Sequence, residues 1–72
     1  IVNNYGLVKG EKELLDMDTR KSFIGIKESR FGFEGLVENR MQARKMFGDR
    51  VVIEKPTLED IMLYYTGGYR ND

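Results

Sequence analysis

The sequence contains neither cysteine nor histidine. Disulfide bonds, thiolate nucleophiles, imidazole bases and the usual zinc-binding sets are therefore excluded. The chain has 72 residues, and a chain of this size buries only ~60% of the surface that its unfolded form exposes. Because nothing covalent supplements so small a core, we expect one small domain whose stability is marginal without a partner.

Charge and hydropathy exclude further classes. Twelve Lys and Arg balance twelve Asp and Glu, whereas nucleic-acid-binding domains usually carry a basic excess. Arg40, Arg44, Lys45 and Arg50 do gather near Phe47, but cations in the last turn of a helix complement its dipole. We therefore interpret this cluster as a solvated helix face and expect no nucleic-acid partner.

The longest uninterrupted apolar run is far shorter than the ~20 residues that span a bilayer. We therefore expect no transmembrane helix. The sequence also opens without a basic segment followed by an apolar core, so we expect no signal peptide and interpret the chain as an excised piece of a longer protein.

Local patterns in the first half predict strands and a short helical segment. Residues 1–10 place apolar pairs on either side of Asn3, Asn4 and Gly6, which predicts a tight N-terminal hairpin. Residues 11–20 fit one or two helical turns. Residues 22–28 predict a strand, and period-two alternation assigns Ile24 and Ile26 to its core face.

The middle of the chain predicts a loop, a helix and a strand. The two glycines in residues 31–35 predict a loop or an irregular edge whose two phenylalanines pack onto the core. Residues 36–47 predict an amphipathic helix that ends at Gly48. Its apolar stripe consists of Leu36, Ala43 and Phe47, widened by Val37 and Met41. The β-branched run at residues 51–53 predicts a short, largely buried strand.

The C-terminal segment has the clearest local pattern. Thr57 and Asp60 have the spacing of a capping box, so we expect a helix near residues 58–66, with Gly67 and Gly68 as its stop. Its predicted core stripe consists of Leu58, Ile61, Met62 and Tyr65. Together these elements predict an α+β fold with a small sheet.

Three apolar side chains at this end of the chain fall outside the predicted core stripe. They are Leu63, Tyr64 and Tyr69. Aromatic residues are enriched at interfaces, so we expect these three side chains to form an interaction surface.

The sequence offers little for catalysis or metal binding. Asp16 with Asp18, and Glu59 with Asp60, are the closest carboxylate pairs. The second pair falls in a helix first turn, where negative charge is favourable, and the first falls in a polar connector. Residues 31–35 are spaced by glycine but lack the Lys and Ser or Thr of a phosphate-binding loop. We therefore expect no catalytic, cofactor-binding or metal-binding residue.

Two strings carry a resemblance. KPTLEDIMLYYTGG, at residues 55–68, resembles the segment that closes the ATP-binding subunits of bacterial ABC exporters of the ABC-2 type. IVNNYGLVKGEKELL, at residues 1–15, looks like the end of the nucleotide-binding domain in those subunits, with Tyr5 inserted in the turn. The two strings occur in the family's order and cover about half of the chain.

The resemblance implies a noncatalytic, regulatory fragment of an ABC transporter ATPase subunit that in full length couples ATP hydrolysis to export. Residues 1–16 would end the nucleotide-binding domain, and residues 17–72 would be the C-terminal accessory region. ATP and magnesium would bind the parent, not this piece. Its partners would be the parent nucleotide-binding domain, a second ATPase subunit and, indirectly, a membrane-spanning permease chain.

The same resemblance implies a cytoplasmic location at the inner face of the cell membrane, and we expect a homodimer. The alternative is a free-standing protein-binding module unrelated to transport. A small enzyme is the third class, and it is disfavoured because no nucleophile and base are paired in the sequence.

Overall fold

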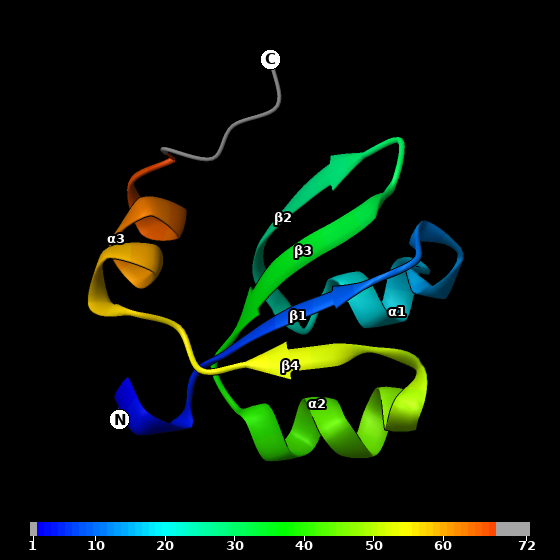
Figure 1. The fold of residues 1–72 in the computed structure, drawn as a ribbon, viewed down its shortest axis with the longest axis horizontal. Coiled ribbons are helices and arrows are strands. Elements are labelled where there is room, and N and C mark those ends of the chain that lie inside the picture. Colours follow the sequence, from blue (N-terminus) through cyan, green and yellow to red (C-terminus); the bar gives the residue numbers. More distant parts are fainter. Residues whose placement is uncertain (1, 68–72) are drawn as a thin grey trace.

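A four-stranded antiparallel sheet forms the centre of the computed structural model, which describes residues 2–67 (Figure 1). The strand order is β2-β3-β1-β4. The strands are β1 (Gly6–Gly10), β2 (Phe23–Ser29), β3 (Gly32–Val37) and β4 (Val52–Glu54). The helices are α1 (Met17–Arg20), α2 (Arg40–Phe47) and α3 (Leu58–Thr66). The predicted α+β class is confirmed.

The predicted N-terminal hairpin is wrong. Val2–Asn4 forms a 3-10 turn, and one strand follows it. This strand, β1, lies between β3 and β4 and pairs with both. β1 is therefore stabilised by strands that are distant in the sequence and not by a neighbouring hairpin arm. Its residues Leu7 and Val8 are buried on opposite faces of the sheet. Within the described residues, strands from both sides of the predicted boundary at residue 16 therefore contribute to one sheet.

The loop predicted at residues 31–35 is instead most of β3, which forms a hairpin with β2. Gly35 is required inside this strand because a Cβ there would overlap Cδ1 of Phe23. Phe33 is buried as expected, but Phe31 is 87% exposed in the turn that precedes β3. The sequence gives no local signal that an aromatic ring covers Gly35.

Ile24 and Ile26 do not share a face. The register between β2 and β3 shifts between Phe23 and Gly25, so an extra residue interrupts the alternation. Ile26 consequently packs with the core cluster beneath α2, whereas Ile24 packs with the cluster beneath α3.

The predicted helix at residues 36–47 begins later than expected. Leu36 and Val37 are the last residues of β3, and the side chain of Asn39 caps α2 by accepting from the Gln42 amide at 3.1 Å. The expected end is confirmed, since Gly48 follows the helix with φ of 63°. Ala43 and Phe47 are buried as predicted, but Met41 is 74% exposed.

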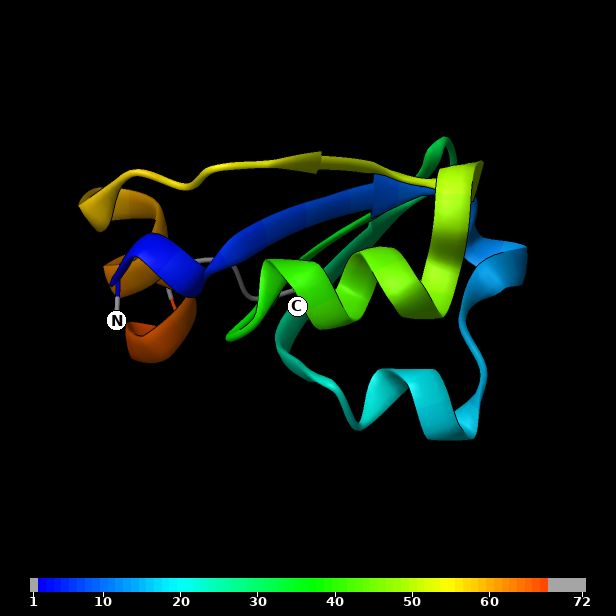
Figure 2. The same cartoon turned by 90° about the horizontal axis from the view of Figure 1, so that it is seen from below.

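The other short elements agree more closely with the sequence. A 3-10 turn (Lys12–Leu14) and α1 account for the one or two turns expected at residues 11–20. β4 forms where a strand was expected, although it is an edge strand with Val52 exposed rather than largely buried. Figure 2 shows α1 and α2 on one side of β1, with α3 beyond the end of the sheet at which β1 begins.

The core consists of two clusters. The larger one lies between the sheet and α2, and Phe23 extends it with an edge-on contact to Phe33, at 5.8 Å between ring centroids. Its buried members are Val8, Phe33, Val37, Ala43, Phe47 and Val51. The smaller cluster joins the sheet to α3 and consists of Leu7, Leu36, Ile61 and Tyr64.

The predicted capping box at the start of α3 is confirmed. The Thr57 hydroxyl accepts from the Asp60 amide at 3.1 Å, and the Asp60 carboxylate accepts from the Thr57 amide at 3.0 Å. Gly67 adopts the left-handed conformation that ends the helix. Gly68, the other predicted stop, lies outside the described residues.

We predict that Thr57→Ala lowers the free energy of unfolding by ~1 kcal/mol, because the Asp60 amide loses its acceptor. Urea denaturation followed by circular dichroism measures the change. Thr66→Ala, the same substitution at the other end of α3, is the control and should change stability by less than about 0.5 kcal/mol. Equal effects of the two substitutions would contradict the capping role.

Candidate functional site

The exposed side of α3 carries three large apolar side chains. Leu58 is 62% exposed, Met62 56% and Tyr65 55%. They follow one another at i, i+4 and i+7, so they lie on one side of the helix. We call these three residues the α3 face.

The α3 face was predicted to be core, and the structure corrects that prediction. Of the predicted core stripe, only Ile61 is buried, and Tyr64 is the other buried residue of the helix. The Tyr64 ring packs against Gly25, and a Cβ on residue 25 would come within 2.9 Å of Cδ1 of Tyr64. The Tyr64 hydroxyl donates a hydrogen bond to the Glu34 carbonyl at 3.2 Å. A glycine distant in the sequence thus determines which side of α3 meets the sheet.

The predicted interaction surface changes accordingly. Tyr64 is a core residue, and Leu63 is half-buried. Tyr69 lies outside the described residues. The sequence signal for the correct surface was the apolar stripe itself, which was read as the buried side of the helix.

A hydrogen bond between two tyrosine hydroxyls fixes one end of the α3 face. The hydroxyls of Tyr5 and Tyr65 are 2.9 Å apart and join the segment before β1 to α3. This hydrogen bond, with a small contribution from desolvation, raises the pKa of Tyr65 to about 12. A phenol is neutral at physiological pH even at its ordinary pKa of 10, and the side chains of Leu58 and Met62 are uncharged, so the α3 face carries no charge.

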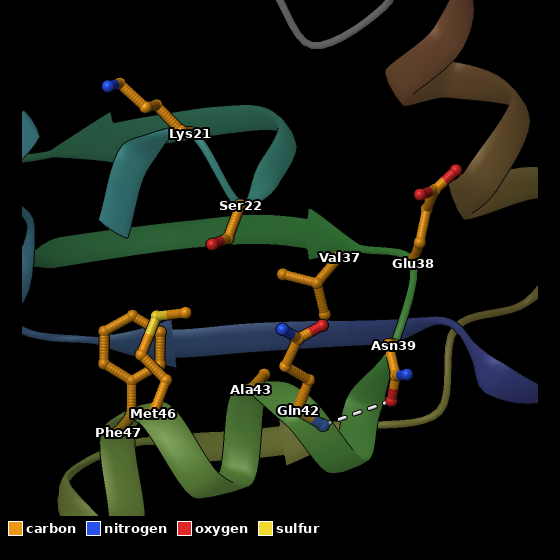
Figure 3. A pocket seen from close by; sticks show the side chains of 9 residues that line it. All are labelled: Lys21, Ser22, Val37, Glu38, Asn39, Gln42, Ala43, Met46 and Phe47. Carbon is orange, nitrogen blue, oxygen red and sulfur yellow. Dashed lines mark hydrogen bonds between the residues drawn. The ribbon is translucent and has the colours of Figure 1, made fainter. Parts of the chain in front are cut away.

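A second candidate is the cleft between α2 and the segment joining α1 to β2 (Figure 3). Its volume of about 430 Å³ lies within the range of small-molecule sites. Figure 3 shows Lys21 and Ser22 on one side and Glu38 and Gln42 on the other. At its base lie the core side chains Val37, Ala43, Met46 and Phe47.

The apolar base of this cleft offers little free surface to a ligand. Val37, Ala43 and Phe47 are at most 3% exposed, so most of their apolar area already contacts the core. The side-chain oxygen Oδ1 of Asn39 already accepts a hydrogen bond from the backbone amide of Gln42 (dashed in Figure 3). We therefore treat the α3 face, and not the cleft, as the candidate site.

One member of each carboxylate pair caps a helix. Asp16 caps α1, accepting from the Thr19 amide at 2.8 Å, and this bond lowers the pKa of Asp16. Asp18 lies 4.0 Å from Lys21. Asp60 belongs to the capping box of α3. Among residues 2–67, no three Asp, Glu, His or Cys side chains lie close enough to hold a metal ion.

The arginines of the basic cluster stabilise the backbone. Arg40 donates to the Tyr5 carbonyl, Arg44 to the carbonyls of Gly48 and Val51, and Arg50 to the Phe47 carbonyl. These bonds occupy carbonyl groups at the end of α2 and before β1. Lys45 is exposed.

The comparisons with known proteins identify no relative. No protein-family model matches the chain, and neither the curated proteins nor the solved structures include a significant match. None of the helices described is both long enough and apolar enough to cross a bilayer.

We predict that Tyr5→Phe returns the pKa of Tyr65 from about 12 toward its ordinary value of 10. The folded state favours the neutral phenol, so the stabilisation from this hydrogen bond is complete below pH 10 and is lost as the pH rises through about 12. Titration of the Tyr65 ring carbon by NMR, in both proteins, measures the shift. The same Tyr65 pKa in both would show that the hydroxyl pair does not form.

Proposed function

We propose that this chain is a noncatalytic interaction and regulatory domain, and that it is the C-terminal accessory region of an ABC transporter ATP-binding subunit. The observation that carries the interaction role is the α3 face. Exposed contiguous apolar surface marks interaction sites in soluble domains, and this one is uncharged and held in place at Tyr65.

The transporter setting rests on the resemblance of residues 55–68 and 1–15. Most of the first string folds as α3 with its capping box. The string that carries the resemblance is thus the one that forms the exposed apolar face. In this setting the partners are the parent nucleotide-binding domain and the second ATPase subunit, and through them the permease chain at the inner side of the membrane.

Regulation in such a subunit requires that the accessory region respond to the state of the catalytic domain. ATP and magnesium belong to the parent in this proposal. The contribution of this chain is a docking surface whose occupancy changes between states of the parent. The smaller core cluster, which anchors α3 to the sheet, would transmit that contact to the rest of the domain.

We predict that the 72-residue chain alone neither binds nor hydrolyses ATP, since residues 31–35 form a turn and strand in place of a phosphate-binding loop. Isothermal titration calorimetry with magnesium and ATP tests binding, and phosphate release tests hydrolysis. Micromolar binding of ATP by the isolated chain would overturn this assignment.

We predict that the reading frame upstream of Ile1 encodes a phosphate-binding loop and an ABC signature motif, which sequencing of the genomic region tests. The encoded nucleotide-binding domain should bind this chain, and Leu58→Lys should weaken that binding about tenfold or more by placing a charge in an apolar contact. Met41→Lys, a change at another exposed apolar side chain, on α2, is the control. An upstream frame without those motifs would refute the transporter setting and leave the free-standing module.

A further inference from the structure

The arginines of α2 keep their full charge in the folded chain. Arg40 donates to the Tyr5 carbonyl, and Arg44 donates to the carbonyls of Gly48 and Val51. A carbonyl group carries no net charge, so these bonds orient the guanidinium groups without neutralising them. In the part of the chain that the structure describes, no carboxylate lies within ion-pair distance of either arginine.

The positive charge is concentrated on α2 and the turn after it. The whole chain is formally neutral, but residues 39–50 contain four cations and a single carboxylate, that of Asp49. The ion pairs of the described residues lie on the strands and around α1 instead. The neutrality of the chain therefore conceals a cationic surface whose charge has no partner within the fold.

A shallow hollow lies between α2 and the edge strand β4 (Figure 1). It is lined by Arg40, Met41, Arg44 and Ile53, and its volume is about 250 Å³. Pockets for small molecules begin at ~300 Å³, so this hollow is too small for most of them, but it has room for one leucine-sized side chain. We call these four residues the α2 groove.

The two guanidinium groups of the α2 groove are anchored at opposite ends of β1. Arg40 is anchored at Tyr5, immediately before the strand, and one of the anchors of Arg44 is Val51. The residue after Val51 pairs with Lys9, four positions beyond Tyr5. At about 3.3 Å per strand residue, the two anchors are more than about 10 Å apart. A single carboxylate or phosphate group cannot contact both, so a matching ligand carries two anionic groups with an apolar group between them.

We propose that the α2 groove binds an acidic peptide segment, in which an apolar side chain lies between two carboxylates in the pattern Glu-x-Leu-x-Glu. Alternate side chains of an extended segment project to the same side, about 7 Å apart. This pattern therefore places the leucine in the hollow and one carboxylate near each guanidinium group. Because β4 is an edge strand of the described sheet, an extended segment along it also meets backbone donors and acceptors.

The chemistry of the groove favours carboxylates and an apolar anchor together. The planar guanidinium group matches a carboxylate with two parallel hydrogen bonds. Two carboxylates close to the groove in the sequence are engaged elsewhere: Glu54 pairs with Lys9 at 3.1 Å, and Glu38 is directed toward α3 (Figure 3). A nucleic acid or an anionic membrane would also contact the cations, but neither presents a single apolar side chain to the hollow between them.

Titration of the isotope-labelled chain with the peptide acetyl-Glu-Ser-Leu-Ser-Glu-amide, followed by NMR, tests the site. We expect the amide signals of Met41 and Ile53 to shift, with a dissociation constant in the millimolar range, because two exposed ion pairs and one apolar contact each contribute little. Raising the salt concentration should weaken the binding.

Two matched peptides separate the charged contacts from the apolar one. In one peptide glutamine replaces both glutamates, and in the other serine replaces the leucine. Each should bind about fivefold or more weakly than the parent peptide. Equal shifts from all three peptides, or shifts of α3 signals in place of those of the α2 groove, would overturn the proposal. These comparisons use the unaltered chain, so they do not depend on how well a variant folds.

Substitutions in the chain test the role of the guanidinium groups. Arg44→Gln should raise the dissociation constant about threefold to fivefold, and Arg44→Lys, which keeps the charge, should raise it less. Arg20→Gln is the matched control, because Arg20 is exposed and already pairs with Glu28 at 3.0 Å. Circular dichroism verifies that each variant folds. Equal effects of Arg44→Gln and Arg20→Gln would contradict the site.

Titrations with phosphatidylglycerol vesicles and with a single-stranded oligonucleotide test the competing partners. Tighter binding of either one than of the peptide, at the same α2 signals, would overturn the proposal in favour of that partner. The α2 groove is separate from the α3 face, and these measurements involve no nucleotide-binding domain. Failure of the transporter setting therefore leaves this inference standing, and failure of peptide binding leaves the proposed function standing.

Discussion

Pairing of β1 with β3 places Leu7 opposite Leu36 and Val8 opposite Gly35. Val8 and Leu36 are the two largest side chains that solvent does not reach at all. Val8 points toward α2, and Leu36 points toward α3. The β1–β3 pair therefore contributes buried side chains to both core clusters. Without this pair, neither α2 nor α3 would have an apolar surface to pack against.

The elements that the sequence predicts well are those with local causes. Thr57 and Asp60 are three positions apart and form their capping box without help from the rest of the chain. Gly48 likewise ends α2 through its own backbone conformation. The missed features depend on distant residues. The Phe23 ring packs where a Cβ of residue 35 would lie, so this strand position needs glycine. The Tyr64 ring likewise packs against Gly25, and this contact fixes the buried side of α3. Neither contact leaves a local pattern.

The same distinction applies to the candidate site. The apolar stripe of α3 is visible in the sequence, but an apolar stripe on a short helix is equally consistent with a buried face and with an exposed one. Tyr64 determines which side of α3 is buried, because its ring packs against Gly25 and its hydroxyl donates a hydrogen bond to the Glu34 carbonyl. Once Tyr64 occupies the core, helix geometry turns Leu58, Met62 and Tyr65 outward. The surface proposed for interaction is thus a consequence of core packing.

The position of β1 between two strands that follow it in the sequence affects how the chain matures on the ribosome. β1 is synthesised before β3 and β4, at roughly 5 to 20 residues per second. The edge of β1 that pairs with β3 therefore stays open until Val37 has emerged, and the edge that pairs with β4 stays open until Glu54 has emerged. The β2–β3 hairpin is the one strand pair of the described sheet that joins strands adjacent in the sequence, so it can form before the other pairs. Val8 consequently stays uncovered until α2 has been synthesised, and Leu7 stays uncovered until α3 has been synthesised.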